Sequence, residues 1–170
     1  MPPLEPLNPR QLTSGLAQRT IKNLDFIVKA HASGADVHVA TQTVNSLLGL
    51  LVFPYEKEKK YFKPFKRMRL GNPPNFQAFA PHVFPPLPSL EVTQFQNCGN
   101  VQRFFGRLRN AIAHRLLEFS SDSHDLHAVR ITMRDRPKKD EPIDWEISMS
   151  VEDLGRLCRY VADRVIQQHL

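Results

Sequence analysis

Residues 100–119 read Asn-Val-Gln-Arg-Phe-Phe-Gly-Arg-Leu-Arg-Asn-Ala-Ile-Ala-His-Arg-Leu-Leu-Glu-Phe, and this stretch decides the fold. At about 100° per residue, its apolar side chains fall on one arc of a helix. The arc consists of Val101, Phe104, Phe105, Leu108, Ile112, Leu116 and Phe119. Asn97 or Asn100 can cap the start, since an asparagine oxygen accepts from free N–H groups there. The stretch therefore predicts an amphipathic helix to about Phe119 that packs on a helical bundle.

The opposite side of this predicted helix is polar and carries Arg103, Arg107, Asn110 and His114, with Arg109 on its flank. Asn110 and His114 are four residues apart, so their side chains are neighbours. A histidine can move a proton near neutral pH, and an arginine can hold phosphate oxygens in pairs. Together these groups suit cleavage of an RNA phosphodiester. From composition and spacing alone, a solvated face or a hydrogen bond between helices is the simpler explanation for them.

Three further segments have helical spacing of apolar residues. We expect helices over residues 11–32, ended by Ser33-Gly34, and from Asp36 to Phe53, stopped by Pro54 because proline has no N–H. Ser150 can cap a last helix, and Asp153 stands where it could close a variant of the capping box. Residues 127–134 and 145–149 alternate between apolar and polar side chains around a charged turn, which predicts a β-hairpin.

Residues 54–98 are expected to form a long irregular loop, since they hold eight of the 14 prolines. Lysines and arginines alternate there with Tyr61, Phe62 and Phe65. Such a pattern suits binding of a nucleic-acid backbone and its bases. The alternative is an ordered loop whose aromatic rings pack on the bundle while its cations face water. The cations are Lys57, Lys59, Lys60, Lys63, Lys66, Arg67 and Arg69.

The bulk properties favour one cytoplasmic domain. The 170 residues fit a flexible N-terminus, residues 1–10, and a single domain, residues 11–170. A net charge of +6 is compatible with a polyanionic partner. The sequence has no run of about 18 apolar residues, so no membrane span is predicted. Two distant cysteines without a C-x-x-C pattern favour a reducing compartment and no metal site.

Two stretches resemble the HEPN superfamily. Arg109-Asn110-Ala-Ile-Ala-His114 is similar to the signature of that superfamily, an arginine and a polar residue followed by a histidine, here with four residues between Arg109 and His114. The broader segment 107–115 resembles the nuclease branch. Residues 45–54, Asn-Ser-Leu-Leu-Gly-Leu-Leu-Val-Phe-Pro, resemble a plasmid-borne HEPN nuclease family. The resemblance covers most of residues 11–170.

The resemblance implies a mainly α fold, a four-helix HEPN-like bundle with the long loop between its second and third helices and the hairpin between its third and fourth. It implies a homodimer in which Arg109 and His114 of both chains line one cleft. It further implies a metal-independent endoribonuclease without cofactors, leaving a 2′,3′-cyclic phosphate and a 5′-hydroxyl. Such enzymes serve as toxins or phage-defence effectors, and an antitoxin protein is then a possible partner.

On this hypothesis the catalytic residues are Arg109, Asn110 and His114. RNA would be bound by Arg103, Arg107, Lys59, Lys60, Lys63 and Lys66. Two other interpretations stay open at this point. The chain could be a non-catalytic HEPN module that binds RNA or a partner protein, or a helical adaptor with no nucleic-acid role.

Overall fold

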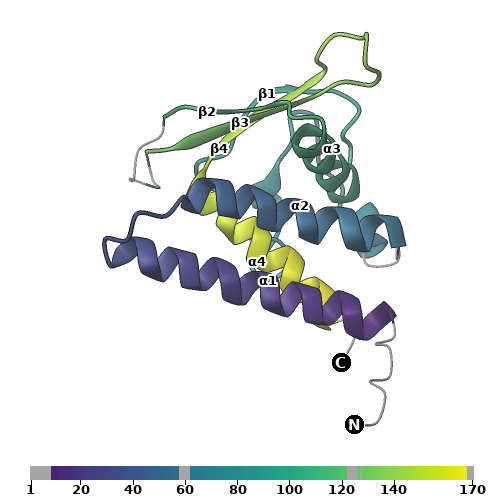
Figure 1. Cartoon of the computed structure of the whole chain (residues 1–170). Coiled ribbons are helices and arrows are strands. Elements are labelled where there is room, and N and C mark those ends of the chain that lie inside the picture. Colours follow the sequence, from purple (N-terminus) through teal and green to yellow (C-terminus); the bar gives the residue numbers. More distant parts are fainter. Residues whose placement is uncertain (1–8, 58–61, 122–125, 127, 168–170) are drawn as a thin grey trace.

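The computed structural model describes residues 9–57, 62–121, 126 and 128–167, in which helices and one antiparallel sheet form the fold (Figure 1). The helices are α1 (Pro9–Ala32), α2 (Val39–Lys57), α3 (Val101–Ala113) and α4 (Val151–Gln167). The strands are β1 (Glu91–Phe95), β2 (Leu117–Phe119), β3 (Arg130–Asp135) and β4 (Trp145–Ser150). The predicted mainly helical chain with a β3–β4 hairpin before the last helix is confirmed, but two further strands complete the sheet. The predicted flexible N-terminus falls mostly outside the described residues.

The sheet has the order β1-β4-β3-β2, and every neighbouring pair is antiparallel. Its inner face is apolar, because alternate residues of β3 and β4 are buried. Its outer face is polar: Arg134 pairs there with Glu118 and Glu146. The inner residues are Ile131, Met133, Trp145, Ile147 and Met149, and the alternation on β3 ends with a buried carboxylate, Asp135.

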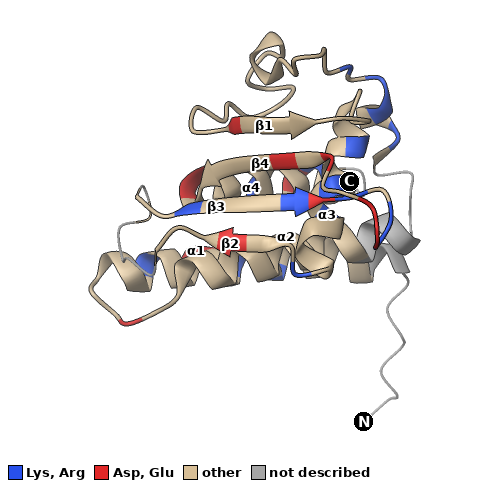
Figure 2. Cartoon of the chain, turned by 90° about the horizontal axis from the view of Figure 1, so that it is seen from above, with Lys and Arg blue, Asp and Glu red and all other residues tan. Residues whose placement is uncertain are grey.

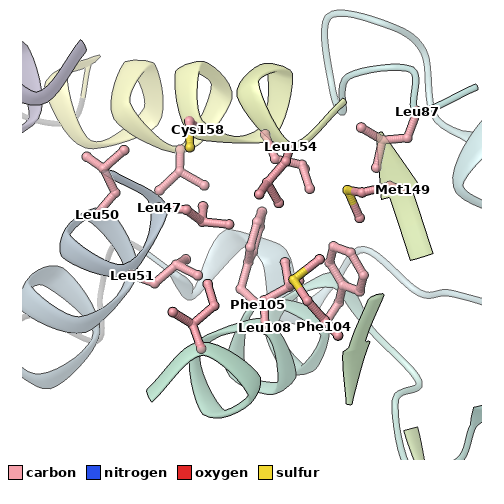
Figure 3. Close-up of a cluster of buried hydrophobic side chains, with 14 of the residues drawn as sticks. Leu47, Leu50, Leu51, Leu87, Phe104, Phe105, Leu108, Met149, Leu154 and Cys158 are labelled. Atoms are coloured by element: carbon pink, nitrogen blue, oxygen red, sulfur yellow. The ribbon is translucent and has the colours of Figure 1, made fainter. Parts of the chain in front are cut away.

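The hydrophobic core joins α3 to the sheet and to α2 and α4 (Figure 3). Phe104, Phe105 and Leu108 of α3 are fully buried, as predicted from the apolar arc. Leu47 and Leu51 of α2 line the same core, and Figure 3 shows them with Leu154 and Cys158 of α4 around Phe105. Burial of each such side chain contributes about 2 kcal/mol. α3 is therefore held firmly along its apolar arc, while its opposite side is left for other contacts.

The end of α3 differs from the prediction. The helix stops at Ala113 rather than near Phe119, and Leu117–Phe119 instead pairs with β3 as strand β2. Arg115 adopts a left-handed backbone conformation with φ of 58°. The Arg115 N–H then donates to the Ile112 carbonyl at 3.1 Å and the Leu116 N–H to the Ala111 carbonyl at 2.8 Å. This is a Schellman ending, normally formed by glycine, which is why the sequence pattern did not reveal it.

The end of α2 also differs from the prediction. α2 passes through Pro54 and ends at Lys57. Proline removes one backbone donor, but here that loss does not terminate the helix. At the other end, the helix begins at Val39 rather than directly after Asp36.

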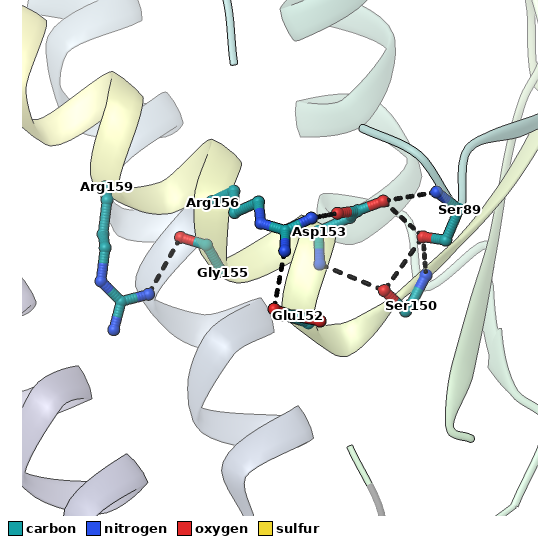
Figure 4. A network of polar contacts seen from close by, with 7 residues as sticks. All are labelled: Ser89, Ser150, Glu152, Asp153, Gly155, Arg156 and Arg159. Atoms are coloured by element: carbon teal, nitrogen blue, oxygen red, sulfur yellow. Dashed lines mark hydrogen bonds and ion pairs between the residues drawn. The ribbon is translucent and has the colours of Figure 1, made fainter. Parts of the chain in front are cut away.

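The predicted caps are confirmed, with Asn100 rather than Asn97 at the start of α3 and Ser150 at the start of α4. Asn100 accepts from the Arg103 N–H at 2.9 Å, and Ser150 accepts from the Asp153 N–H at 3.2 Å. The predicted capping box is wrong in its second half, because Ser89 intervenes (Figure 4). The Ser150 N–H donates to the Ser89 hydroxyl oxygen at 2.9 Å, and the Asp153 carboxylate accepts from the Ser89 N–H at 2.8 Å. The loop before β1 is thereby tied to the start of α4.

The segment predicted as an irregular loop is more ordered than expected. It contains strand β1 and two short 3-10 helices, Pro64–Lys66 and Phe76–Ala78. Phe62 and Phe65 are buried, and the ring of Phe65 lies 5.2 Å from that of Phe105 in α3. These rings pack on the core, so stacking of nucleic-acid bases on them is excluded in this conformation. Tyr61, the third aromatic residue, lies outside the described residues.

Candidate functional site

A cleft of about 560 Å³ opens at the C-terminal end of α3. One wall consists of Asn110, His114 and Leu116, and the other is the turn between β3 and β4. The turn contributes Asp135, Arg136, Pro137, Lys138, Lys139 and Asp140. The structure therefore brings together two of the three residues predicted to be catalytic, and it adds a charged turn as their neighbour. Figure 2 shows blue and red segments gathered at this turn beside α3.

His114 owes its position to the way α3 ends. Its N–H donates to the Asn110 carbonyl at 2.9 Å, so it closes the last helical turn. The left-handed Arg115 then turns the chain toward β2, and His114 is left exposed at the helix end. An exposed imidazole beside a cleft can exchange a proton with solvent or with a bound ligand.

Arg107 lies one turn before Asn110 and binds two carboxylates. Its Nη1 is 3.0 Å from Oδ2 of Asp135 and 2.9 Å from Oδ1 of Asp144. Burial alone lowers the pKa of Arg107, but hydrogen bonds with Asp144 and Asp135 outweigh it, so this pKa is raised above its ordinary value. The guanidinium is thus permanently charged, and its charge is compensated within the protein. This arrangement weakens the hypothesis that Arg107 binds RNA phosphates.

Asn110 shares the carboxylate of Asp135 with Arg107. Its Nδ2 donates to Oδ2 of Asp135 at 3.2 Å. Asp135 is only 2% exposed, since it ends the inner face of β3. The Asn110 side chain is therefore held on one side by a buried acceptor, and on the other side it faces the cleft that it lines.

Arg109 does not line this cleft. It follows Leu108 on the helix and is about 100° away from Asn110, so its half-buried side chain leaves α3 in another direction. Arg103 is exposed and donates from Nη1 to the Asn97 carbonyl at 3.2 Å. A single chain thus places Asn110 and His114 together and holds Arg109 apart.

Four cations line a second hollow, of about 620 Å³, on the segment beside the 3-10 helix Pro64–Lys66. They are Lys63, Lys66, Arg67 and Arg69, here named the basic cluster, and all four are exposed. The segment is fixed to the start of α3: the Leu70 N–H donates to the Gly99 carbonyl at 3.1 Å, and the Val101 N–H to the Met68 carbonyl at 3.0 Å. The backbone that carries the basic cluster is therefore held against the start of α3 by hydrogen bonds. Lys59 and Lys60 lie outside the described residues.

Asp135, Asp144 and the turn between them were not predicted from the sequence to be part of the site. Two acidic residues that flank a predicted hairpin turn could have indicated this part of the site, because they lie at the base of the turn, where the sheet meets α3. In the part of the chain that is described, no group of three or more His, Cys, Asp or Glu side chains is placed to hold a metal ion. None of the helices in that part is long and apolar enough to cross a membrane.

Comparison with known proteins identifies the family. No curated protein and no solved structure matches the chain significantly. The sequence model of one family, HEPN pEK499 p136, matches residues 5–170, which is nearly the whole chain. The chain with its α3 cleft therefore belongs to the HEPN pEK499 p136 family and to the HEPN superfamily.

Proposed function

We propose that the chain is a metal-independent endoribonuclease, with the cleft at the end of α3 as its catalytic site. HEPN domains are commonly ribonucleases or toxins, which supports this chemical class. The observation that carries the proposal is that His114 and Asn110 share one open cleft of about 560 Å³, large enough for a nucleotide. A role as a toxin or phage-defence effector, with an antitoxin as partner, is part of the same proposal.

The reaction needs a base, an acid and a positive charge at phosphorus. His114 takes the proton from a ribose 2′-hydroxyl, whose oxygen then bonds to phosphorus. The bond from phosphorus to the 5′-oxygen breaks, and that oxygen leaves with a proton from the imidazolium of His114 or from solvent water. The products are a 2′,3′-cyclic phosphate and a 5′-hydroxyl. General acid–base assistance of this kind contributes roughly 10² to 10⁴ in rate.

Arg109 is assigned to the charge that develops on the phosphoryl oxygens. Because it leaves α3 away from the cleft of its own chain, the proposal includes a two-fold homodimer in which Arg109 approaches the cleft of the other chain. A two-fold contact uses the same surface on both chains, so two such sites form together. The basic cluster would hold the RNA backbone at the opposite end of α3 from His114.

The test is incubation of the purified protein with mixed RNA in the presence of EDTA. We expect cleavage that EDTA does not inhibit, with 5′-hydroxyl ends that accept labelled phosphate without prior phosphatase treatment. His114→Ala should abolish cleavage. His38→Ala, which removes another exposed histidine outside the cleft, should leave the rate unchanged. Equal rates for the wild type and His114→Ala would contradict the assignment.

A second candidate is a non-catalytic HEPN module that binds RNA or a partner protein. The position of Arg109 favours it, since of the three predicted catalytic residues a single chain places only Asn110 and His114 in the cleft. This candidate predicts that the wild type retains RNA and cleaves none of it.

A further inference from the structure

The carboxylate of Asp135 determines which way the amide of Asn110 faces. The amide has one end that donates and one that accepts, and the two ends are otherwise nearly identical in shape. Oδ2 of Asp135 receives Nη1 of Arg107 at 3.0 Å and Nδ2 of Asn110 at 3.2 Å. A carboxylate that binds a guanidinium only accepts hydrogen bonds, so only the donor end of Asn110 can face it.

The accepting end of Asn110 is consequently turned away from Asp135. No group in the described ranges donates to its Oδ1. The side chain lines the same cleft as His114, so Oδ1 presents an acceptor to a ligand there. Such an acceptor repels a phosphate oxygen but attracts a hydroxyl group. A ribose 2′-hydroxyl is the hydroxyl that distinguishes RNA from DNA.

We propose that Asp135 is a positioning residue that holds Oδ1 of Asn110 toward the cleft, where it accepts a hydrogen bond from the 2′-hydroxyl of a nucleotide next to the one that His114 deprotonates, and so restricts the site to RNA. This inference rests on the proposed function, because it places the RNA chain in the α3 cleft. Asn110 contacts the substrate, whereas Asp135 acts through Asn110. Arg107 supports the pair, since its guanidinium binds the carboxylates of both Asp135 and Asp144.

Substitutions at position 135 separate this role from a merely structural one. Asp135→Asn retains one side-chain oxygen. Arg107 only donates hydrogen bonds, so this oxygen should face Arg107, in the position where it also accepts from Nδ2 of Asn110. This conservative variant should therefore keep the amide of Asn110 in place. Asp135→Ala removes the acceptor and frees the amide to rotate. Asp163→Ala removes an exposed carboxylate of α4 outside the cleft and is the matched control.

The experiment measures binding rather than cleavage, in proteins that all carry His114→Ala. Each protein is titrated with one single-stranded RNA and with its fully 2′-fluoro analogue, which cannot donate a hydrogen bond from the sugar. We expect the His114→Ala protein to bind RNA about five-fold more tightly than the analogue, the value of one neutral hydrogen bond. Adding Asp135→Ala or Asn110→Ala should reduce this ratio to about one. Adding Asp135→Asn or Asp163→Ala should leave it unchanged.

The outcomes separate the inference from the proposed function. A ratio that Asp135→Ala does not lower overturns the inference alone, provided that RNA is still bound. If Asp135→Ala unfolds at the assay temperature, Asn110→Ala decides instead, and an unchanged ratio overturns the inference. Absence of any RNA binding overturns both. If the wild type cleaves no RNA but the affinity ratio of RNA to the analogue is still about five-fold, the inference is supported and the proposed nuclease activity is contradicted.

Discussion

The Nη1 atom of Arg107 lies 3.0 Å from Oδ2 of Asp135, and the two side chains are only 12% and 3% exposed. The same guanidinium reaches Asp144, so one arginine of α3 holds both ends of the turn between β3 and β4. That turn is one wall of the cleft that contains His114. Arg107 therefore shapes the site by fixing its wall, which is a different role from the contact with RNA that its place on the polar arc predicted.

Arg107→Ala should destabilise the fold strongly. Removal of one partner from a buried ion pair leaves uncompensated charge, here on two adjacent carboxylates, and costs about 3–5 kcal/mol. Arg103→Ala, on the same arc but exposed, should change the free energy of unfolding by no more than about 0.5 kcal/mol. Urea titration of both variants measures the difference. Equal stabilities would show that the ion pair contributes nothing net.

The basic cluster should govern the salt dependence of RNA binding. Changing Lys63, Lys66, Arg67 and Arg69 to glutamine should flatten the slope by about 0.7 log units per log unit of salt for each phosphate that the variant no longer neutralises. The cleavage rate at saturating RNA should be nearly unchanged, because uniform binding does not lower the chemical barrier. Glutamine at the exposed α1 cations Arg19, Lys22 and Lys29 is the control. A slope that is equally flat in both variants would mean that only net charge matters.

The two cysteines make stability sensitive to alkaline pH. Burial raises the pKa of the Cys98 and Cys158 thiols from 9.0 to about 12. The folded chain therefore keeps protons that the unfolded chain releases, so their contribution is complete below pH 9 and is lost as the pH rises toward 12. At pH 10, ionisation in the unfolded chain should lower the free energy of unfolding by about 1 kcal/mol for each thiol. Urea titrations at pH 8 and pH 10 should show a smaller decrease in the double Cys→Ala variant, and an identical decrease would contradict this.

Periodicity predicted the parts of the fold that depend on local patterns. The apolar arc of α3 and the alternation of β3 and β4 are visible because each repeats over several residues. Strand β1 could not be predicted this way, since four of its five residues are exposed and its pairing partner β4 lies about 50 residues later. The end of α3 was missed for another reason: Arg115 occupies a left-handed position that sequence rules assign to glycine.

In the candidate site, too, the local features could be predicted from the sequence and the long-range contacts could not. The spacing of four residues correctly placed Asn110 beside His114, because that distance is fixed by the helix itself. The partners of Arg107 lie 28 and 37 residues further along the chain, and only the folded hairpin brings them to α3. The predicted dimer and the role of Arg109 concern a contact between two chains, so they remain predictions that need an experiment of their own.

A mixing experiment tests the composite site directly. Arg109→Ala and His114→Ala should each be inactive alone, because every site then lacks one group. If the two inactive proteins are unfolded together and refolded, half of the dimers contain one chain of each kind. Such a heterodimer has one intact site, built from Arg109 of one chain and His114 of the other, so activity should recover to about a quarter of the wild-type value. Each variant refolded by itself is the control. A monomer by light scattering, or a refolded mixture without activity, would contradict a site shared between two chains.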